Sequence, residues 1–294
     1  MSKIIKTGAN SIILGNFHYN NFVKPKEEKL LKITKITKGH DEFQYLDLVR
    51  EIKNYNKYYS IPDNDYIVLN PSDNFYHDLK ELVKDHQIKI FTNTSLQCFY
   101  IDYAGNTDLH DIILEMKQYD LSVFNSYSKI NFFVKHILKG IMFLHNKKLC
   151  HLDIKPENIM VNKYTNTFKI IDFGFCTQEP FIRFLKNKKG TPGYFPKKIA
   201  EPEPGLPEIK ANDFVKVNGN IPILKDNMLV YKIDSYCFGR VLNFLFYIFN
   251  EYKSVSCYDN NQKRAKINSI ISDLCCNDVI KRITITDCYN KYFN

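Results

Sequence analysis

Four polar side chains near the middle of the sequence have the types that phosphoryl transfer requires. Asp153, Lys155 and Asn158 lie close together, and Asp172 follows fourteen positions after Asn158. A carboxylate can orient an attacking hydroxyl, and an amine can steady the charge on the transferring group. Amide and carboxylate oxygens are ligands that Mg2+ prefers. The spacing therefore indicates catalytic roles for Asp153 and Lys155 and a metal pair formed by Asn158 and Asp172.

The flanking segments have patterns that would deliver these side chains to loops. Apolar residues at helical spacing over 126–145 predict a long amphipathic helix that ends shortly before Asp153. Residues 168–171 are largely apolar and indicate a short strand that leads into Asp172. Gly174 permits a sharp turn directly after it.

Two sequence motifs closely resemble those of a known protein family. Residues 151–158, HLDIKPEN, and residues 172–174, DFG, with Phe143-Leu144-His145 upstream, resemble the catalytic and magnesium loops of eukaryotic-type protein kinases. The resemblance implies an α+β, bilobal fold with a small β-rich lobe, a larger α-helical lobe and an active site in the cleft. It implies an ATP-dependent protein phosphotransferase that uses Mg2+, with Mn2+ as the alternative metal. Lys155-Pro156-Glu157 favours serine and threonine over tyrosine as acceptors.

The same resemblance suggests how the chain would bind the nucleotide. Lys32, on a strand-like stretch over 30–36, would contact the α- and β-phosphates, although Lys29 and Lys35 remain alternatives. Glu51, on a helix expected over 41–58, would form its ion pair. Gly8 belongs to the segment that stands where a glycine-rich phosphate loop is expected.

A strand over 96–103 would lead into the connection between the lobes. Asp102, Tyr103 and Ala104 would present backbone groups to the adenine edge, with Ile101 as the gatekeeper. Asp108 stands where the family often has a ribose-binding acid, and it is equally suited to cap the helix that begins there. Both roles remain open.

The resemblance covers nearly the whole chain as one kinase domain. We expect an N-lobe over 1–101, a hinge over 102–107 and a C-lobe over 108–294. Residues 202–224 hold four of the eleven prolines, which predicts an irregular excursion inside an insertion at 202–228. Helical pattern resumes near Asp234.

Further landmarks of the family occur in the second half of the sequence. By resemblance, Asp234 would brace the backbone of the catalytic loop, and Thr191 would help to order that loop. Arg282 fits the terminal helical region, but the glutamate that usually pairs with it is missing or displaced to Glu201.

The sequence departs from the family pattern in two further places. Only Gly8-Ala9-Asn10-Ser11, with Gly15 later, stands in place of a GxGxxG loop, which lessens the expected ATP affinity. Leu152 replaces an arginine that in many kinases pairs with a phosphorylated activation loop. We therefore predict activity that does not depend on phosphorylation of that loop.

Composition limits the remaining function classes. A formal charge of +9 is compatible with anionic partners, but the lysines are dispersed and no aromatic-interleaved basic repeat occurs. ATP and protein substrates are the expected partners, with no nucleic acid and no membrane; the oligomeric state is left open. The eight cysteines form no CxxC pair, and the chain opens without a signal peptide. We expect reduced thiols and an intracellular location, cytoplasmic or nuclear.

Two other functions are compatible with parts of the sequence. A pseudokinase, which uses the fold only for binding or scaffolding, is favoured by the degenerate glycine loop and opposed by the complete set of catalytic side chains. A small-molecule kinase shares the aspartate, the asparagine and the later magnesium aspartate, but usually lacks Lys155-Pro156-Glu157. The lysine- and asparagine-rich composition suggests an origin in a large DNA virus or an AT-rich protist.

Overall fold

The computed structural model describes the chain in separate stretches. They are residues 3–7, 11–15, 29–37, 94–102, 104–118, 123–173, 176, 191, 193–194, 214–217, 221–224, 228–252 and 261–294. The chain divides into two compact units, Met1–Tyr103 and Ala104–Asn294. Among the helices of these stretches, none combines the length and the apolar character that crossing a bilayer requires.

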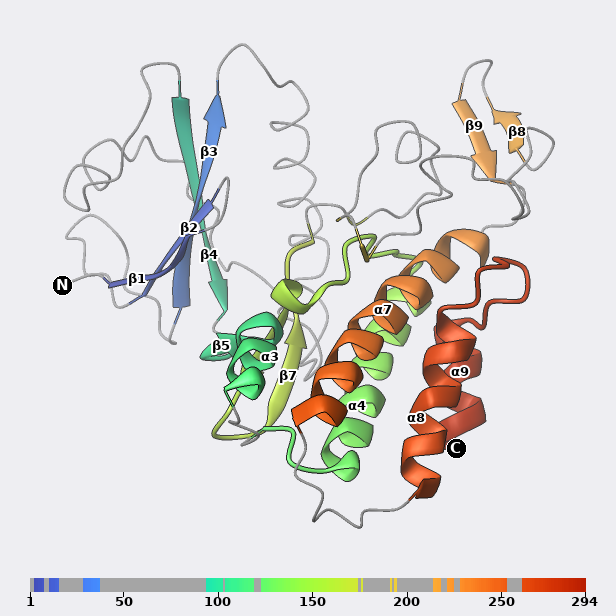
Figure 1. Ribbon diagram of the computed structural model, residues 1–294. Helices are drawn as coiled ribbons and strands as arrows, with labels where there is room; N and C mark the ends of the chain where they lie inside the picture. The colour runs from blue at the N-terminus through green and yellow to red at the C-terminus, as the bar shows by residue number, and fades with distance from the viewer. Residues whose placement is uncertain are drawn as a thin grey trace. The chain divides into compact units, whose positions relative to one another are not determined.

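The first unit contains a four-stranded antiparallel sheet in the order β1-β2-β3-β4 (Figure 1). Its strands are β1 (Lys3–Thr7), β2 (Ser11–Gly15), β3 (Lys29–Thr37) and β4 (Thr94–Asp102). Isoleucine, threonine and aromatic residues recur in these strands, as is typical of a pleated surface. The strands expected over 30–36 and 96–103 are confirmed with small shifts.

A three-stranded antiparallel sheet forms part of the second unit. It consists of β5 (Thr107–Asp108), β6 (Ile159–Asn162) and β7 (Thr167–Ile170) in that order. Alternate residues of β7, Phe168 and Ile170, are buried, which is the period-two pattern of a half-buried strand. The turn between β6 and β7 is closed by the Asn162 side chain, which accepts from the backbone N–H of Tyr164 and Thr165.

The helices α3 and α4 begin at side chains that satisfy their first backbone donors. Asp108 caps α3 (Leu109–Lys117), and Ser126 caps α4 (Tyr127–Asn146) by accepting from the backbone N–H of Lys129. The apolar face of α4 is fully buried at Ile130, Phe133 and Ile137. The helix predicted over 126–145 is therefore confirmed, displaced by one residue.

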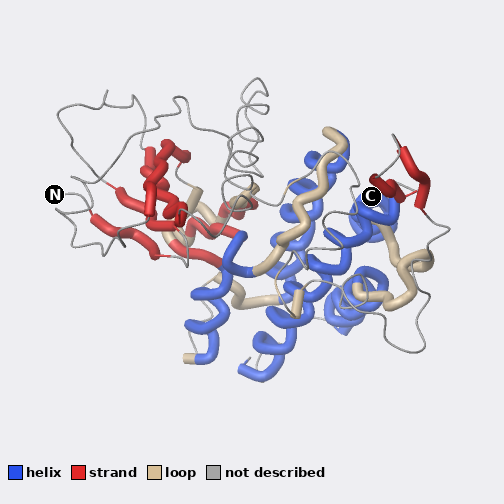
Figure 2. The backbone as a smooth tube through the Cα atoms, turned by 90° about the horizontal axis from the view of Figure 1, so that it is seen from above, coloured by secondary structure: helices blue, strands red, loops and turns tan. Residues whose placement is uncertain are grey.

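Three further helices pack with α4 to form the core of the second unit. They are α7 (Met228–Tyr252), α8 (Asn261–Leu274) and α9 (Ile285–Phe293), which lie beside α4 in Figure 1. Figure 2 shows the helices of this unit from above. Phe133 joins this packing to the small sheet, since its ring lies 5.0 Å from that of Phe168 and 5.4 Å from that of Phe124. Burying such rings supplies much of the driving force for folding.

Two expectations about residues 202–240 need correction. Helix α7 begins at Met228, six residues before Asp234, because the apolar Met228, Leu229 and Val230 continue the helix toward its N-terminus. The proline-rich stretch includes a hairpin of β8 (Phe214–Val217) and β9 (Ile221–Leu224). Pro222 fits there because a strand in a two-stranded sheet needs only part of its backbone N–H groups for pairing.

Other predictions fall on parts of the chain outside the described residues. These are the helix over 41–58 and most of the insertion at 202–228. The boundary between the two compact units falls after Tyr103.

Candidate active site

Asp153 lies at the centre of a hydrogen-bonded cluster in the loop that follows α4. Its Oδ1 accepts from the hydroxyl of Thr191 at 2.7 Å, and its Oδ2 accepts from Nδ2 of Asn158 at 3.0 Å. Lys155 Nζ lies 3.1 Å from Oδ2 and donates to the Thr191 hydroxyl at 2.9 Å. The Asp153 side chain is only 3% exposed. Donors on both oxygens fix the direction in which this carboxylate points.

Local chain geometry explains how Asn158 reaches Asp153. Lys155 is extended, as a residue before proline prefers, and Pro156 opens the single 3-10 turn η1 (Pro156–Asn158). That turn places Asn158 so that Nδ2 also donates to the Asp153 carbonyl at 2.8 Å. The donor end of the amide is thus committed within the loop, which leaves its carbonyl oxygen for a cation.

The loop that carries Asp172 is joined to the Asp153 loop by hydrogen bonds. The backbone N–H of Ile171 donates to the Asn158 carbonyl at 3.0 Å, and the Ile171 carbonyl lies 3.0 Å from Nε2 of His151. The next residue, Asp172, has φ of +66°, which is rare outside glycine and redirects the chain at the end of the strand. The structure therefore brings together the two loops that the sequence predicted to cooperate.

His151 bridges the two loops in one tautomer. Its Nε2 faces a carbonyl, which can only accept, and its Nδ1 faces the backbone N–H of Asp153 at 3.3 Å, which can only donate. The ring is therefore neutral with its proton on Nε2. Buried Phe173 packs against this ring with centroids 5.5 Å apart. No separate role of His151 was predicted from the sequence.

Asp234 fixes the backbone of the loop that carries Asp153, as the resemblance implied. Its Oδ2 accepts from the N–H of His151 at 2.8 Å and from Nε2 of His145 at 3.0 Å. Its Oδ1 accepts from the N–H of Leu152 at 2.8 Å. Leu152 has φ of +65°, an unfavourable conformation for a branched side chain, and these bonds help to hold it there. The contribution of His145 was not predicted.

The side chain of Leu152 is buried, with 2% exposure. By the resemblance stated above, this is the position where many protein kinases carry an arginine. An apolar, buried side chain offers no donor to a phosphate.

The segment that ends at Thr191 and Tyr194 is tied to α7. Arg240 Nε donates to the carbonyl of Gly193 at 3.0 Å, and Gly193 has φ of +90°, which glycine adopts without strain. The phenol of Tyr194 has its pKa raised to about 12, first by burial and then by the nearby carboxylate of Glu157, while Arg240 lowers it. Tyr194 is therefore a neutral hydrogen-bonding group over the working pH range.

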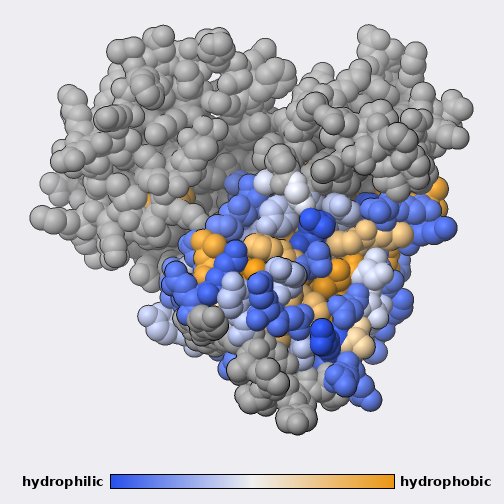
Figure 3. Space-filling model, viewed as in Figure 1, coloured by the Kyte–Doolittle hydropathy of each residue, from blue (hydrophilic) through white to orange (hydrophobic). Residues whose placement is uncertain are grey.

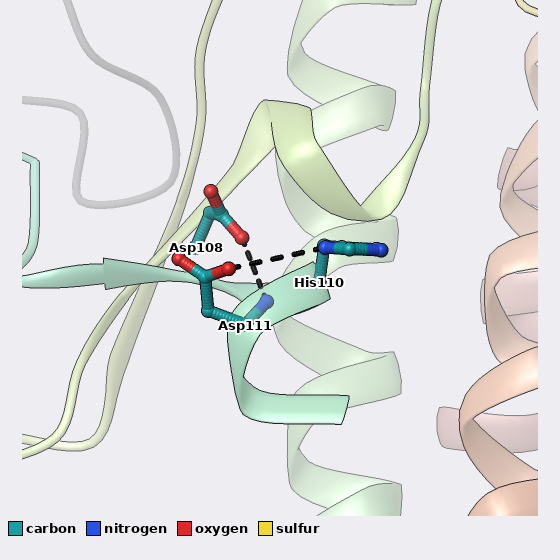
Figure 4. Close-up of side chains that lie close together, drawn as sticks. All are labelled: Asp108, His110 and Asp111. Carbon is teal, nitrogen blue, oxygen red and sulfur yellow. Dashed lines mark hydrogen bonds and ion pairs between the residues drawn. The ribbon is translucent and has the colours of Figure 1, made fainter. Parts of the chain in front are cut away.

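Asp108 has the capping role that was one of its two predicted functions. It is 1% exposed, and its Oδ1 accepts from the backbone N–H of Asp111 at 2.9 Å (Figure 4). His110 Nδ1 lies 3.9 Å from Asp111 Oδ1. One possible ligand atom from each of Asp108, His110 and Asp111 lies within 4.8 Å of the other two. One oxygen of Asp108 is committed to the helix cap, which weakens the cluster as a metal site.

The segment before Asp108 lies against β6. The backbone N–H of Asn106 donates to the carbonyl of Val161 at 3.1 Å. A Cβ on Gly105 would come within 2.6 Å of the same carbonyl oxygen, so only glycine allows this approach. Ala104, one of the predicted hinge residues, is buried with 7% exposure.

The remaining predicted nucleotide residues lie in the first unit or next to it. The register places Lys32 of β3 opposite Ile13 of β2 and Phe99 of β4. Asp102 is the last residue of β4. Gly8, Glu51 and Tyr103 fall outside the described residues. Their roles remain predictions.

Arg282 is buried and satisfied by neutral groups. Its Nε donates to the Cys276 carbonyl at 2.8 Å, Nη1 donates to the Lys232 carbonyl at 3.1 Å, and the guanidinium lies 4.7 Å from the ring centroid of Tyr236. Burial lowers the pKa of Arg282. Glu201, the predicted substitute partner, lies outside the described residues.

Comparison with known proteins agrees with these features. Residues 79–208 match the family model of the protein kinase domain. Death-associated protein kinase 2 of Homo sapiens is 39% identical over 103 residues, which are 32% of this chain and 28% of that protein. The probable serine/threonine-protein kinase HSL1 of Saccharomyces cerevisiae is 26% identical over 155 residues, 50% of this chain and 10% of that protein. Death-associated protein kinase dapk-1 of Caenorhabditis elegans is 28% identical over 162 residues, 53% of this chain and 10% of that protein.

Residues 79–208 of the chain are therefore similar to the protein kinase domain, and the relatives described here are protein kinases by name. The chain spans less than a third of the length of each of these three relatives.

Proposed function

We propose that this chain is a serine/threonine-protein kinase that transfers the γ-phosphoryl group of ATP to protein hydroxyls. The observation that carries the proposal is the cluster of Asp153, Lys155, Asn158 and Thr191, hydrogen-bonded to the loop of Asp172. Such chemistry depends mainly on positioning and charge stabilisation, which a rigid cluster supplies.

Each residue of the cluster has a role that fits its contacts. Asp153 would orient the acceptor hydroxyl and take up its proton, since its two oxygens are held by Thr191 and Asn158. Lys155 would steady negative charge on the transferring group from its position 3.1 Å from Asp153. Thr191 links the two, so it would act as a positioning residue.

The donor set also fits a magnesium ion. Nδ2 of Asn158 is used twice within the loop, so its carbonyl oxygen is the end that would face a cation, and Asp172 would add a carboxylate. When bound, Mg2+ would supply charge neutralisation on the phosphates of ATP. The proposal includes the bilobal architecture, in which the sheet unit would contribute Lys32 to the nucleotide site.

The relatives described above are named as serine/threonine or death-associated protein kinases, which supports a protein acceptor over a small molecule. A complete cluster of Asp153, Lys155 and Asn158 also opposes a role limited to scaffolding. Buried Leu152 supports activity that does not depend on phosphorylation of the activation loop.

Transfer of labelled phosphate from ATP to a generic protein substrate, with and without Mg2+, tests the proposal. The Asp153→Asn variant should transfer at least about a hundredfold more slowly, because the group that accepts the proton is lost. Glu251→Gln removes one carboxylate from the exposed end of α7 and should leave the rate unchanged. Equal rates of phosphate transfer for the wild type and Asp153→Asn would refute the proposal and favour a pseudokinase.

A further inference from the structure

Arg240 is a charged residue of the second unit to which the proposed phosphoryl transfer gives no role. It lies in the interior of α7, and its side chain is half-buried. Its Nε donates to the carbonyl of Gly193 at 3.0 Å. Gly193 is two residues from Thr191, whose hydroxyl donates to Asp153 at 2.7 Å. One hydrogen bond therefore ties this guanidinium to the segment that contacts the carboxylate of the candidate site.

The chain geometry limits the distance between Arg240 and the position of the proposed acceptor. Two residues of chain span about 7 Å at most, so the Cα atoms of Thr191 and Gly193 lie no further apart than that. A substrate segment in extended conformation advances about 3.3 Å per residue. The guanidinium therefore lies within reach of a substrate side chain that is about two or three residues from the acceptor hydroxyl.

The guanidinium of Arg240 keeps donors that the fold does not use. Among the described residues, the Gly193 carbonyl is its single hydrogen-bond partner, and no carboxylate forms an ion pair with it. A guanidinium carries several N–H donors in a fixed fork, and its Nη groups hold a carboxylate well. Nη1 and Nη2 are therefore open to an anion from outside the chain.

The groups around Arg240 do not neutralise its charge. Burial raises the pKa of the Tyr194 phenol to about 12 and that of the Cys275 thiol to about 11, so both groups are uncharged at neutral pH. Burial also raises the pKa of Tyr236, which lies one turn earlier on α7. Glu157 acts on the Tyr194 phenol as Arg240 does, but in the described part of the chain these two charges form no ion pair.

The sequence around Thr191 carries charge of the same sign. Residues 180–200 contain no aspartate or glutamate. Their basic residues are Arg183, Lys186, Lys188, Lys189, Lys197 and Lys198, which lie outside the described part of the chain. A segment with charge of one sign attracts partners of the opposite sign. The sequence and the position of Arg240 therefore indicate the same kind of substrate side chain.

We propose that Arg240 is a specificity-determining residue that selects protein substrates with an aspartate or glutamate about two or three residues from the acceptor serine or threonine. This inference rests on the proposed function, because it names the substrate class of the same site. The substrate carboxylate would accept from Nη1 and Nη2, while Nε keeps its bond to the Gly193 carbonyl. Such a contact forms in the bound substrate as well as in the transition state, so KM rather than kcat should report it.

Phosphate transfer from ATP to a set of synthetic peptides tests this selectivity. Each peptide has one acceptor serine in a neutral sequence, with a single glutamate placed in turn at each of the three positions before and after it. The reference peptides carry glutamine instead. For the wild type, kcat/KM should be about tenfold higher with glutamate at the favoured position, mainly through KM, and added salt should reduce this ratio. Arg240→Gln should bring the ratio to about one.

The ratio compares two peptides with the same enzyme, so a general loss of activity does not affect it. Arg240→Glu should favour a lysine peptide over the glutamate peptide, which a purely structural role of Arg240 does not predict. Arg240→Lys keeps the charge without the guanidinium fork, so it should retain a reduced preference even if the other two variants unfold. The matched control, Arg264→Gln, removes the same charge from an exposed position of α8 and should keep the wild-type ratio.

Failure of this inference and failure of the proposed function give different results. If the wild type transfers phosphate to none of the peptides in the presence of Mg2+, the proposed function is refuted and this inference falls with it. If the wild type uses glutamate and glutamine peptides equally, or if Arg240→Gln keeps the glutamate preference, only this inference is overturned. An equal loss of preference in Arg264→Gln would ascribe the effect to net charge and would also overturn it.

Discussion

At the scale of single residues, the candidate site depends on carboxylates that each hold several donors. Under the proposed function Asp153 would orient the acceptor hydroxyl, whereas Asp234 holds the backbone of the loop that carries Asp153. Asp234 is completely buried and accepts from two backbone N–H groups and from His145. A buried charge is tolerated when it is satisfied in this way. The loop conformation, with Leu152 at positive φ, is therefore coupled to a residue 82 positions away.

Replacing Asp234 by asparagine tests this coupling. The amide has one accepting oxygen, so its NH2 group would face a donor, and at least one buried N–H would lose its partner. We expect Asp234→Asn to lower the free energy of unfolding by about 2 kcal/mol and the transfer rate at least about tenfold. Urea unfolding and the phosphate-transfer assay measure the two effects. A variant with normal stability and rate would show that the loop does not need this carboxylate.

At the scale of secondary-structure elements, close approach of helices fixes the second unit. Gly239 lies in the interior of α7, where it faces the end of α8. A Cβ at this position would come within 2.7 Å of Cys275 Sγ and 2.8 Å of Leu274 Cβ. Glycine normally weakens a helix, so its presence here reflects the packing of α7 on α8 rather than helix propensity.

The Gly239→Ala change separates the effect of helix propensity from the effect of packing of α7 on α8. Helix propensity alone would favour alanine by about 1 kcal/mol, but the new methyl group overlaps α8. We expect a net loss of about 1–3 kcal/mol in the free energy of unfolding, measured by chemical denaturation. Asn243→Ala, on the exposed face of the same helix, should instead stabilise slightly. Stabilisation by both changes would contradict the close contact with α8.

At the scale of the whole molecule, the burial and the pKa of the cysteine thiols indicate which parts of the chain are packed. Cys150, Cys176, Cys237 and Cys288 are buried and free. Burial, then the charge of Asp234, raises the pKa of Cys150 and of Cys237 well above the ordinary value, and burial raises that of Cys288 to about 12. The thiols of Cys150, Cys237 and Cys288 are therefore protonated at neutral pH, and burial shields all four thiols from reagents.

Thiol labelling of the native chain should therefore be selective. At pH 8 the four buried thiols should react at least about a hundredfold more slowly than a free cysteine, because only a local opening exposes them. Peptide mapping by mass spectrometry identifies the labelled positions, and labelling in guanidinium should be complete. Rapid labelling of Cys237 in the native state would show that the core around α7 is not formed as described.

Local patterns predicted the elements that depend on near neighbours. The apolar spacing over 126–145 predicted α4 almost to the residue. The motif at 151–158 and the aspartate at 172 predicted a cluster whose members lie in two loops. The hairpin of β8 and β9 was missed, since Pro222 argued against a strand and the pairing depends on partners rather than on composition.

The sequence by itself determined which side chains the proposed chemistry would use, because the types and spacing of Asp153, Lys155, Asn158 and Asp172 are local properties of the chain. Only the tertiary structure decided what holds these side chains in place: the bonds of Asp234 to the loop and the tautomer of His151. These features depend on contacts between residues far apart in sequence. Such contacts form only when helices pack, and no local pattern specifies which side chains then meet.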